Sequence, residues 1–360
     1  MLENIKFEIF GESHGAMIGV TVTGIPAGVA IDEAKLALFM ARRKSVKEAF
    51  STPRMEADEP IFVAGVYNGV TTGAPITAVI QNTSQRSNDY NHLSVKPRPS
   101  HADYVASVKY GGHSDMRGGG HFSGRLTAPL CILGFIAKEI LKSNGITVEA
   151  YVSDLGGVHS VSYKETNLTT AMIEELREGR IPTLCREKEA EMLDKILASA
   201  KKQDSLGGAV ECVVDGVPVG FGDALWSGLE GKIAHMLFGV PAVKGVEFGS
   251  GFDLINMSGS EANDDFYING DKIATTTNNS GGINGGISNG MQLTMRAAFR
   301  PTPSISCTQQ TVDISTGKAV SLNIGGRHDQ CIVPRAVAPV ESAVAIAILD
   351  GLKTFKASQI

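Results

Sequence analysis

Residues that move protons or hold anions are concentrated between positions 95 and 129. This stretch contains His101, His113, His121, Arg98, Arg117 and Arg125, with three consecutive glycines at 118–120. Imidazole exchanges protons near neutral pH, and guanidinium holds carboxylate or phosphate groups through paired hydrogen bonds. Glycines let backbone N–H groups come close to an anion, and the start of a helix adds its positive dipole end. The stretch therefore predicts a site for a substrate with several negative charges whose reaction needs acid–base catalysis.

Three further islands could contribute to such a site. They are GESHG at 11–15, the run TTTNNSGGINGGISNG at 275–290 with RPTPS at 300–304, and GRHD at 326–329 with Pro334, Arg335 and Glu341. A histidine between glycines is more often part of an ordinary turn, so each island is a weak indication alone. The spacing of His101, His113 and His121 matches no metal-ligand pattern, so no metal site is predicted. A triad of Ser13, His101 and Asp329 stays open, although it lacks the nucleophile-elbow context.

The composition argues against some classes of partner. The chain has 360 residues, of which 42% are hydrophobic and 20% charged, with a formal net charge of −5. This is typical of a globular protein, and no broad positive field would attract nucleic acid or a membrane surface. Five scattered cysteines without a C-x-x-C pair predict reduced thiols in a cytoplasmic protein. No signal peptide is expected from the first residues, and the longest apolar run, 128–137, is too short to cross a bilayer.

The hydrophobic pattern predicts both strands and helices. Strands are expected at 5–10, 18–23, 147–152, 209–214, 243–249 and 291–299, with short strands between 60 and 80. Helices are expected at 32–43, 125–142, 187–201, 224–237 and 340–355, and a loop at 44–58. The helix-to-strand order of 125–152 recurs at 224–248, which suggests an internal duplication. No shift in composition marks a linker, so residues 1–360 are predicted to form a single α+β domain with layered helices and antiparallel strands.

Taken together, the islands resemble those of the chorismate synthase family. The resemblance is carried by GESHGAMIGVTVTGIP (11–26), RPSHADY (98–104), RGGGHFSGRLTAP (117–129), AVKGVEFG (242–249), GGISNG (285–290), RPTPSI (300–305) and GRHDQCIVPRAVAPVESA (326–343). These stretches occur in the family's order and cover the chain almost from end to end. The resemblance implies a central helical layer sandwiched between antiparallel β-sheets, a β-α-β sandwich, and usually a homotetramer.

The resemblance also implies an enzyme, a phosphate lyase acting in the last step of the shikimate pathway towards aromatic amino acids. Its substrate would be 5-enolpyruvylshikimate 3-phosphate, which loses phosphate and a ring proton in a 1,4-anti elimination that gives chorismate. The reaction would need reduced FMN and yet be redox-neutral overall. How the flavin is reduced stays open between an activity of the chain itself, with NADPH as reductant, and an outside donor.

The resemblance assigns roles residue by residue. His14 would protonate the departing phosphate, His101 would protonate the reduced flavin, and Asp329 would be the carboxylate coupled to removal of the ring proton. Ser13 and Ser123 would hydrogen-bond the histidine loop and the flavin. The substrate-binding residues would be Arg43, Arg98, Arg125 and Arg327. The flavin-binding residues would be His121, Phe122, Ser123, Ala242, Gly285, Arg300, Pro301, Thr302, Pro303, Ser304 and Arg327.

Two stretches depart from the family's common pattern. Residues 121–124 are His-Phe-Ser-Gly, where many members have Arg-Ser-Ser-Ala, so one flavin contact is expected to differ. Residues 44–49 lack the arginine that many members carry, since Ala49 stands in its place, and Lys44 or Lys47 would have to substitute. Arg300 stands where lysine is common, which keeps the positive charge.

Two other functions remain as alternatives. A flavin oxidoreductase could use the same glycine-rich loops, but it would consume reduced cofactor in proportion to product. A non-catalytic relative could bind flavin or phosphate, but plain binding would require none of His14, His101 and Asp329.

Overall fold

The computed structural model describes residues 2–44, 56–83, 95–166, 168–324 and 329–358. Its helices are α1 (Glu33–Ala41), α2 (Asp103–Lys109), α3 (Thr127–Lys142), α4 (Thr170–Leu176), α5 (Arg186–Lys201), α6 (Leu229–Phe238), α7 (Gly259–Ala262) and α8 (Val333–Ser358). Its strands are β1 (Lys6–Gly11), β2 (Met17–Thr23), β3 (Ile61–Ala64), β4 (Val66–Tyr67), β5 (Val70–Thr71), β6 (Ile76–Gln81), β7 (Thr147–Leu155), β8 (Val158–His159), β9 (Gly208–Asp215), β10 (Val243–Phe248), β11 (Phe266–Asn269), β12 (Lys272–Thr275), β13 (Ile283–Asn284), β14 (Ile287–Ser288), β15 (Leu293–Phe299), β16 (Gln309–Asp313) and β17 (Lys318–Leu322). Short 3-10 turns lie at Arg117–Phe122, Gly124–Leu126, Leu225–Ser227 and Gly251–Asn256.

One antiparallel sheet has the strand order β1-β2-β6-β3. In its first hairpin Gly11 pairs with Ile18, so the GESHG segment forms the turn between β1 and β2. Ile76, Ala78 and Ile80 alternate along β6 and are buried, because a strand presents every second side chain to the same face. This sheet contacts α3 through β2 and β6. The loop that carries His14 is therefore attached to a sheet with a buried face.

The second sheet has the order β10-β15-β9-β7-β8, and its neighbouring strands are antiparallel. Most residues of β7 and β9 are buried. Val148, Ala150 and Val152 belong to the main core, whereas Tyr151 packs in a second cluster that includes Ile173 of α4. Side chains therefore cover both faces of the sheet at these strands.

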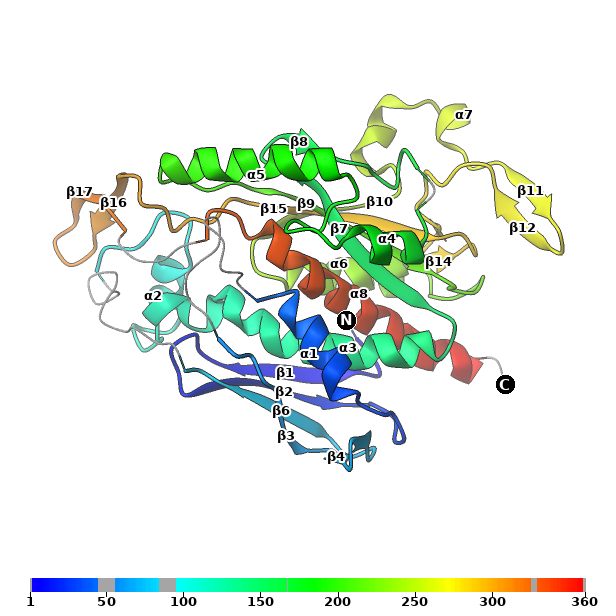
Figure 1. The fold of residues 1–360 in the computed structure, drawn as a ribbon, viewed down its shortest axis with the longest axis horizontal. Coiled ribbons are helices and arrows are strands. Elements are labelled where there is room, and N and C mark those ends of the chain that lie inside the picture. The colour runs from blue at the N-terminus through cyan, green and yellow to red at the C-terminus, as the bar shows by residue number, and fades with distance from the viewer. Residues whose placement is uncertain (1, 45–55, 84–94, 167, 325–328, 359–360) are drawn as a thin grey trace.

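Helices α3 and α8 pack against each other between the two sheets (Figure 1). α3 contacts β2 and β6 of the first sheet and also β7 of the second, whereas α8 contacts β7 and β9. The helices come close at Gly134, where an added Cβ would lie 2.2 Å from the Cβ of Ser342. Among the described residues, the main hydrophobic cluster includes side chains from Ile5 to Leu352. The loops that emerge from both sheets are thus positioned by one continuous core.

The prediction of helices combined with antiparallel sheets is confirmed. The helix expected to begin at 125 begins at Thr127, after a 3-10 turn, and the one expected at 224 begins at Leu229. The second start is later because Gly228 has an extended backbone and follows another 3-10 turn. The last helix begins at Val333 instead of 340, since Pro334 falls in its first turn, where a missing N–H is tolerated.

Several elements were not predicted at all. They are α2, α4, α7, β8 and the hairpins β11–β12, β13–β14 and β16–β17. Most of the loop expected at 44–58 lies outside the described residues. β7 and β10, the strands of the suggested duplication, lie in the same sheet, but the duplication itself stays a prediction.

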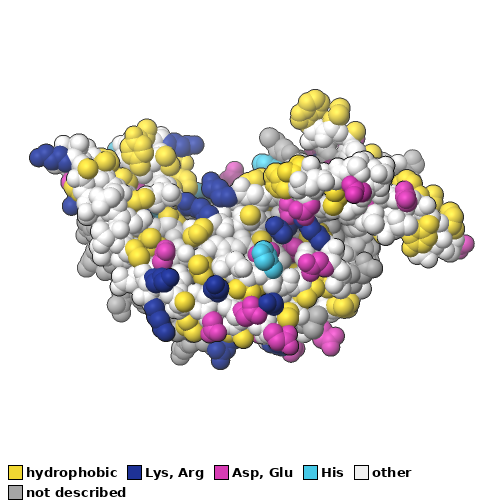
Figure 2. Space-filling view, turned by 90° about the horizontal axis from the view of Figure 1, so that it is seen from above, with side chains coloured by type: hydrophobic (Ala, Val, Ile, Leu, Met, Phe, Trp, Pro, Cys, Tyr) yellow, Lys and Arg dark blue, Asp and Glu magenta, His cyan; other side chains and the backbone are white. Residues whose placement is uncertain are grey.

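Two hairpins project from the ends of the molecule (Figure 1). The β11–β12 hairpin carries exposed hydrophobic side chains, which colour the right-hand end of the space-filling view yellow (Figure 2). Within the described ranges, no helix is both long and apolar enough to cross a membrane.

Candidate active site

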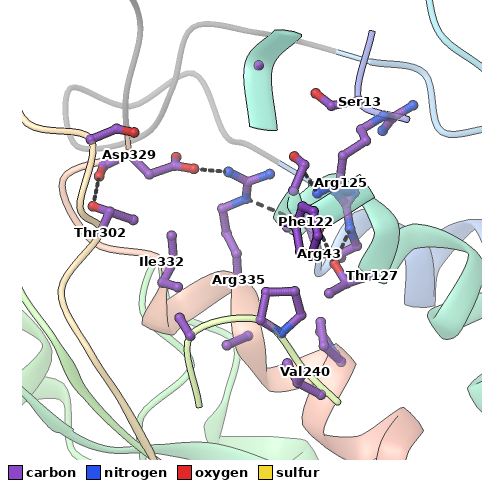
Figure 3. A pocket seen from close by; sticks show the side chains of 18 of the residues that line it. Ser13, Arg43, Phe122, Arg125, Thr127, Val240, Thr302, Asp329, Ile332 and Arg335 are labelled. Carbon is purple, nitrogen blue, oxygen red and sulfur yellow. Dashed lines mark hydrogen bonds and ion pairs between the residues drawn. The ribbon is translucent and has the colours of Figure 1, made fainter. Parts of the chain in front are cut away.

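A cavity of about 320 Å³ brings the predicted reactive residues together. Its walls come from the β1–β2 turn, residues 43, 44, 56 and 58, the segment between 98 and 127, residues 240–242, residues 299–304, and residue 329 with the first turns of α8. Small-molecule sites in proteins have volumes of roughly 300–1,000 Å³, so this cavity has the size of a ligand site. Figure 3 shows Arg335 between Asp329 on one side and Arg43 and Arg125 on the other.

The glycine triplet positions His14. Oγ of Ser13 lies 3.1 Å from Nδ1 of His14, and the backbone N–H of Ser13 donates to the carbonyl of Gly120 at 3.1 Å. Gly118 packs directly on the ring, since an added Cβ would lie 2.1 Å from Cε1 of His14. Its φ of +68° is also a backbone conformation that residues other than glycine rarely adopt. Only glycine fits position 118 without displacing the histidine.

Asp103 joins His101 to Arg98. Nε and Nη2 of Arg98 each donate to the Asp103 carboxylate at 2.7 Å, and Oδ1 of Asp103 lies 2.7 Å from Nδ1 of His101. Burial alone would raise the pKa of Asp103, but hydrogen bonds from Arg98 and His101 hold it well below its ordinary value. Asp103 is the first residue of α2, and the loop before it includes Ser100 at a φ of +59°. This arrangement places a fixed anion behind a fixed cation and an imidazole.

Arg43 and Arg125 share Asp58. The carboxylate accepts from Nη1 of Arg43 at 2.8 Å and from Nη1 of Arg125. Nε of Arg43 donates to Oγ1 of Thr127 at 3.0 Å, and Nε of Arg125 donates to Oδ1 of Asn82 at 3.0 Å. Burial and the like charges of Arg335 and Arg125 lower the pKa of Arg43 to about 10, although Asp58 opposes them. Arg43 therefore stays charged at neutral pH.

Asp329 is held by Arg335. Nη1 of Arg335 donates to Oδ2 of Asp329 at 2.5 Å, and Nε of Arg335 donates to the backbone carbonyl of Arg43 at 3.1 Å. Oγ1 of Thr302 donates to the backbone carbonyl of Asp329 at 2.8 Å. Arg335 thus connects the proposed carboxylate with the arginine on the facing wall (Figure 3).

The cavity collects most of the predicted site residues. Its lining includes Ser13, His14, Arg43, Arg98, His101, Phe122, Ser123, Arg125, Ala242, Arg300, Thr302, Pro303, Ser304 and Asp329. His121, Gly285 and Pro301 are exposed and do not line it. His121 instead has Nδ1 at 3.1 Å from the carbonyl oxygen of Gly11. Arg327 lies outside the described residues, as do Lys47 and Ala49, whereas Lys44 lines the cavity.

Sequence reasoning assigned no role to the residues that orient the predicted ones. They are Asp58, Asn82, Asp103, Thr127 and Arg335. Asp103 and Arg335 lie inside stretches that carried the family resemblance. Their charged side chains could have marked them as candidates, but no role was predicted for them. Asp58 and Asn82 had no comparable signal, because each is an ordinary polar residue next to a strand. In the part of the chain that is described, no group of three or more His, Cys, Asp and Glu side chains could hold a metal ion.

The chain is similar to known proteins over almost its whole length. A family model described as chorismate synthase matches residues 5–352. Chorismate synthase of Thermococcus gammatolerans is 44% identical over 355 residues, which cover 98% of this chain and 97% of the relative. Chorismate synthase of Dehalococcoides mccartyi is 45% identical over 341 residues, which cover 95% of this chain and 93% of the relative.

The fold is also shared with a solved structure. A crystal structure of chorismate synthase superimposes with a TM-score of 0.77 at 27% sequence identity, covering 99% of this chain and 93% of the other. A match of this extent involves both sheets and the helices between them, as well as every wall of the cavity. The chain therefore belongs to the chorismate synthase family.

Proposed function

We propose that this chain is a phosphate lyase that converts 5-enolpyruvylshikimate 3-phosphate into chorismate by 1,4-anti elimination, with reduced FMN as cofactor. The observation that supports it best is one cavity lined by His14, His101 and Asp329 together with several arginines. Binding an anion would need the arginines alone, whereas two imidazoles and a carboxylate are the groups of acid–base catalysis. Membership of the chorismate synthase family supports the same reaction.

The cavity suits a substrate with two carboxylates and a phosphate. Its described lining includes the cations Arg43, Lys44, Arg98, Arg125, Arg300 and Arg335 and the carboxylates Glu56, Asp58 and Asp329. Nη2 of Arg125 is buried without a hydrogen-bond partner among the described residues. A buried donor of this kind gains from an anionic ligand, and each charge-assisted hydrogen bond contributes about 1.5–3 kcal/mol. We propose that Arg43, Arg98 and Arg125 bind the substrate, with Arg327 as a further contact that the family resemblance implies.

The residues on the other wall fit a flavin. Nε of Arg300 is buried and has no hydrogen-bond partner in the described ranges. Ala242 adopts a φ of +75°, which is strained for a residue other than glycine and is typical of ligand-contacting segments. We propose that FMN is held by Phe122, Ser123, Ala242, Arg300, Thr302, Pro303 and Ser304, and that His121, Gly285, Pro301 and Arg327 contribute as the resemblance implies. When bound, reduced FMN would supply electron density that assists the loss of phosphate, with no net change in its own oxidation state.

Different acid–base groups of the chain carry out the separate proton transfers. We propose that His14 protonates the departing phosphate and that Ser13 orients its ring from Nδ1. His101 carries the proton on the flavin side of the cavity, and Asp329 is the carboxylate used in removing the ring proton. General acid–base groups of this kind each contribute about 10²–10⁴-fold to a rate. Arg335 keeps the Asp329 side chain directed, and Ser123 is proposed as a hydrogen-bonding partner at the flavin.

The cellular context is proposed from the family. The chain would act in the cytoplasm, in the shikimate pathway towards aromatic amino acids, and as a homotetramer. NADPH is proposed as the reductant of FMN if the chain reduces its own cofactor, and an outside donor takes that place if it does not.

An anaerobic assay tests the reaction. The purified chain is mixed with FMN, dithionite and 5-enolpyruvylshikimate 3-phosphate, and chorismate is followed by its absorbance. The proposal expects chorismate to form without net consumption of reduced flavin. Correctly folded protein that makes no chorismate would falsify it. Consumption of reductant in proportion to product would instead identify an oxidoreductase.

A further inference from the structure

We infer that Asp103 is a positioning residue for His101: its carboxylate keeps the imidazole protonated at Nδ1, so that Nε2 exchanges protons with the cavity. This inference rests on the proposed function, because it refines the role that His101 has there. Asp103 does not itself line the cavity, so it would act only through its neighbours.

The first observation is the contact between the two side chains. Nδ1 of His101 lies 2.7 Å from Oδ1 of Asp103, and the two side chains are 14% and 3% exposed. Nδ1 is buried and makes no hydrogen bond of good geometry among the described residues, so the Asp103 carboxylate is the polar group that the structure places beside it. No other described group competes for this nitrogen, so the carboxylate determines which ring nitrogen carries the proton.

The direction of the hydrogen bond follows from the chemistry of the carboxylate. An ionised carboxylate can only accept hydrogen bonds, so the imidazole nitrogen beside it must be the donor. Neutral imidazole has one N–H and one lone pair, and a proton on Nδ1 therefore leaves the lone pair on Nε2. A carboxylate behind a histidine sets the tautomer in the same way in serine proteases and in metal sites.

Arg98 keeps the carboxylate in place. Nε and Nη2 of Arg98 bind both carboxylate oxygens at 2.7 Å, and the backbone N–H of Arg98 donates to Oδ2 at 2.9 Å. With these bonds and His101, the carboxylate has no freedom to rotate. Nη1 of Arg98 also donates to Oγ of Ser304 at 3.2 Å. Guanidinium has five N–H groups, so two remain for a substrate anion. Asp103 thus connects a substrate-binding arginine with a proton carrier.

The opposite edge of the ring is left accessible by glycine. A Cβ added at Gly119 would lie 3.6 Å from Nε2 of His101 and 3.7 Å from Cε1. Only a hydrogen atom occupies that direction in the chain as it is. Because His101 lines the cavity, Nε2 is the nitrogen that a ligand can approach past Gly119.

Nuclear magnetic resonance of the full chain tests the tautomer without turnover. Protein labelled with ¹⁵N-histidine is measured at a pH where the rings are neutral, and the His101 signals are identified by their loss in His101→Gln. The wild-type ring is expected to carry its proton on Nδ1. In Asp103→Asn it is expected to shift towards Nε2–H, because the amide can donate to Nδ1. A wild-type ring protonated at Nε2 overturns the inference.

A double-mutant cycle tests whether Asp103 acts through His101. Asp103→Asn is expected to lower kcat at least about tenfold, whereas the same change added to His101→Ala lowers it less than about twofold further, because coupled residues are not additive. Asp103→Glu keeps the carboxylate and is expected to restore part of kcat. If the kcat losses of the two single variants multiply in the double variant, the inference is overturned. An unchanged kcat in Asp103→Asn also overturns it. The control is Asp194→Asn, which removes an exposed carboxylate from α5 and should leave kcat unchanged.

The two experiments separate this inference from the proposed function. A wild-type chain that makes no chorismate contradicts the proposed reaction, but the tautomer of His101 can still be measured. If Asp103→Asn fails to fold, as judged by circular dichroism, the wild-type spectrum and Asp103→Glu still decide the matter.

Discussion

At the scale of single residues, the site depends on two glycines, because their backbone conformations are ones that residues with a side chain rarely adopt. Gly118 lies against the ring of His14, and Gly119 lies beside the ring of His101. The glycine triplet therefore lies close to both proposed proton carriers. A loop with any larger side chain at 118 would displace a histidine without removing a reactive group.

Gly118→Ala should inactivate the enzyme although it deletes no functional group. The new Cβ would lie 2.1 Å from Cε1 of His14 and 2.8 Å from Oγ of Ser13, so the ring must move. We expect kcat for chorismate formation to fall by about 10²-fold or more. This is the lower end of the rate enhancement that one general acid–base group provides. The control is Gly112→Ala, which has a similar positive φ of +81° but no atom within 4 Å of the new Cβ. Equal losses in both variants would mean that backbone strain, not contact with His14, is responsible.

Arg125→Ala should weaken substrate binding more than it slows catalysis. Asp58 would keep its hydrogen bond from Arg43, so the buried carboxylate is not left alone and the fold should survive. Losing a charge-assisted contact of about 1.5–3 kcal/mol should raise the dissociation constant about 10- to 150-fold, measured by titration calorimetry. Arg186→Ala, which removes an exposed arginine from α5, should leave it unchanged. An unchanged constant in Arg125→Ala would show that Arg125 does not face the substrate.

At the scale of elements, one buried glutamate joins five of them. Glu341 of α8 is completely buried and accepts hydrogen bonds from Arg42 after α1, Lys138 of α3 and Arg177 after α4. Its Oε1 also accepts from the backbone N–H of Ala150 in β7 at 3.1 Å. Arg42 precedes Arg43 in sequence, so this network also fixes the chain next to the cavity.

Glu341→Gln should destabilise the fold in a pH-dependent way. Burial alone would raise the pKa of Glu341, but Arg42, Lys138 and Arg177 hold it well below its ordinary value. Burial and the charge of Glu341 raise the pKa of Glu149, so Glu149 takes up a proton first. Breaking a buried ion pair costs about 3–5 kcal/mol, and urea unfolding at pH 7 should show a loss of this size.

The sign of the pH effect follows from the lowered pKa. A carboxylate whose pKa is depressed by folding contributes fully above the pKa of the unfolded chain, about 4.5, and loses this contribution as the pH falls. The difference in the free energy of unfolding between wild type and Glu341→Gln should therefore reach its full size at pH 7 and be smaller below about pH 4.5. A difference that stays constant over this range would contradict the assignment. Glu187→Gln, at an exposed position, serves as the control.

The crossing of α3 and α8 should not tolerate a single methyl group. In Gly134→Ala the new Cβ would lie 2.2 Å from both Cβ and Oγ of Ser342. Overpacking of this kind costs about 1–3 kcal/mol, measured as a lower urea midpoint. Gly231→Ala in α6 has its nearest atom at an ordinary 3.7 Å and should stabilise by about 0.5–1 kcal/mol through helix propensity. If both variants shifted the midpoint in the same direction, close packing at Gly134 would not be the cause.

At the scale of the whole molecule, the β11–β12 hairpin is a candidate contact between copies of the chain. Phe266, Ile268 and Ile273 of this hairpin are 72%, 74% and 63% exposed. Hydrophobic side chains colour the right-hand end of Figure 2 yellow. Monomeric proteins rarely leave clustered hydrophobic side chains in water, so an exposed group of them indicates a protein interface. The proposed homotetramer would cover this surface.

Charging the hairpin should break the assembly. Analytical ultracentrifugation of the wild type should give about four times the chain mass of 38.0 kDa, and Phe266→Asp combined with Ile268→Asp should give smaller particles. Leu38→Asp, at an exposed position of α1, should leave the assembly intact. A monomeric wild type would contradict the homotetramer, and an unaffected double variant would place the interface elsewhere.

The sequence alone determined the types of reactive residue, the family and the strongly periodic elements. It did so because periodicity is a local property and because the motifs of a family occur in a characteristic order. α3, β7, β9 and β15 were predictable for the first reason, and His14, His101 and Arg125 for the second.

Only the tertiary structure decided how these residues are held. Asp58 lies between Arg43 and Arg125, and Asp103 lies behind His101, because α3 and the loops around it pack onto two sheets from distant parts of the chain. Spacing along a chain does not record which loops meet. The same packing leaves His121 at the surface, outside the lining of the cavity, which its place in the sequence does not reveal.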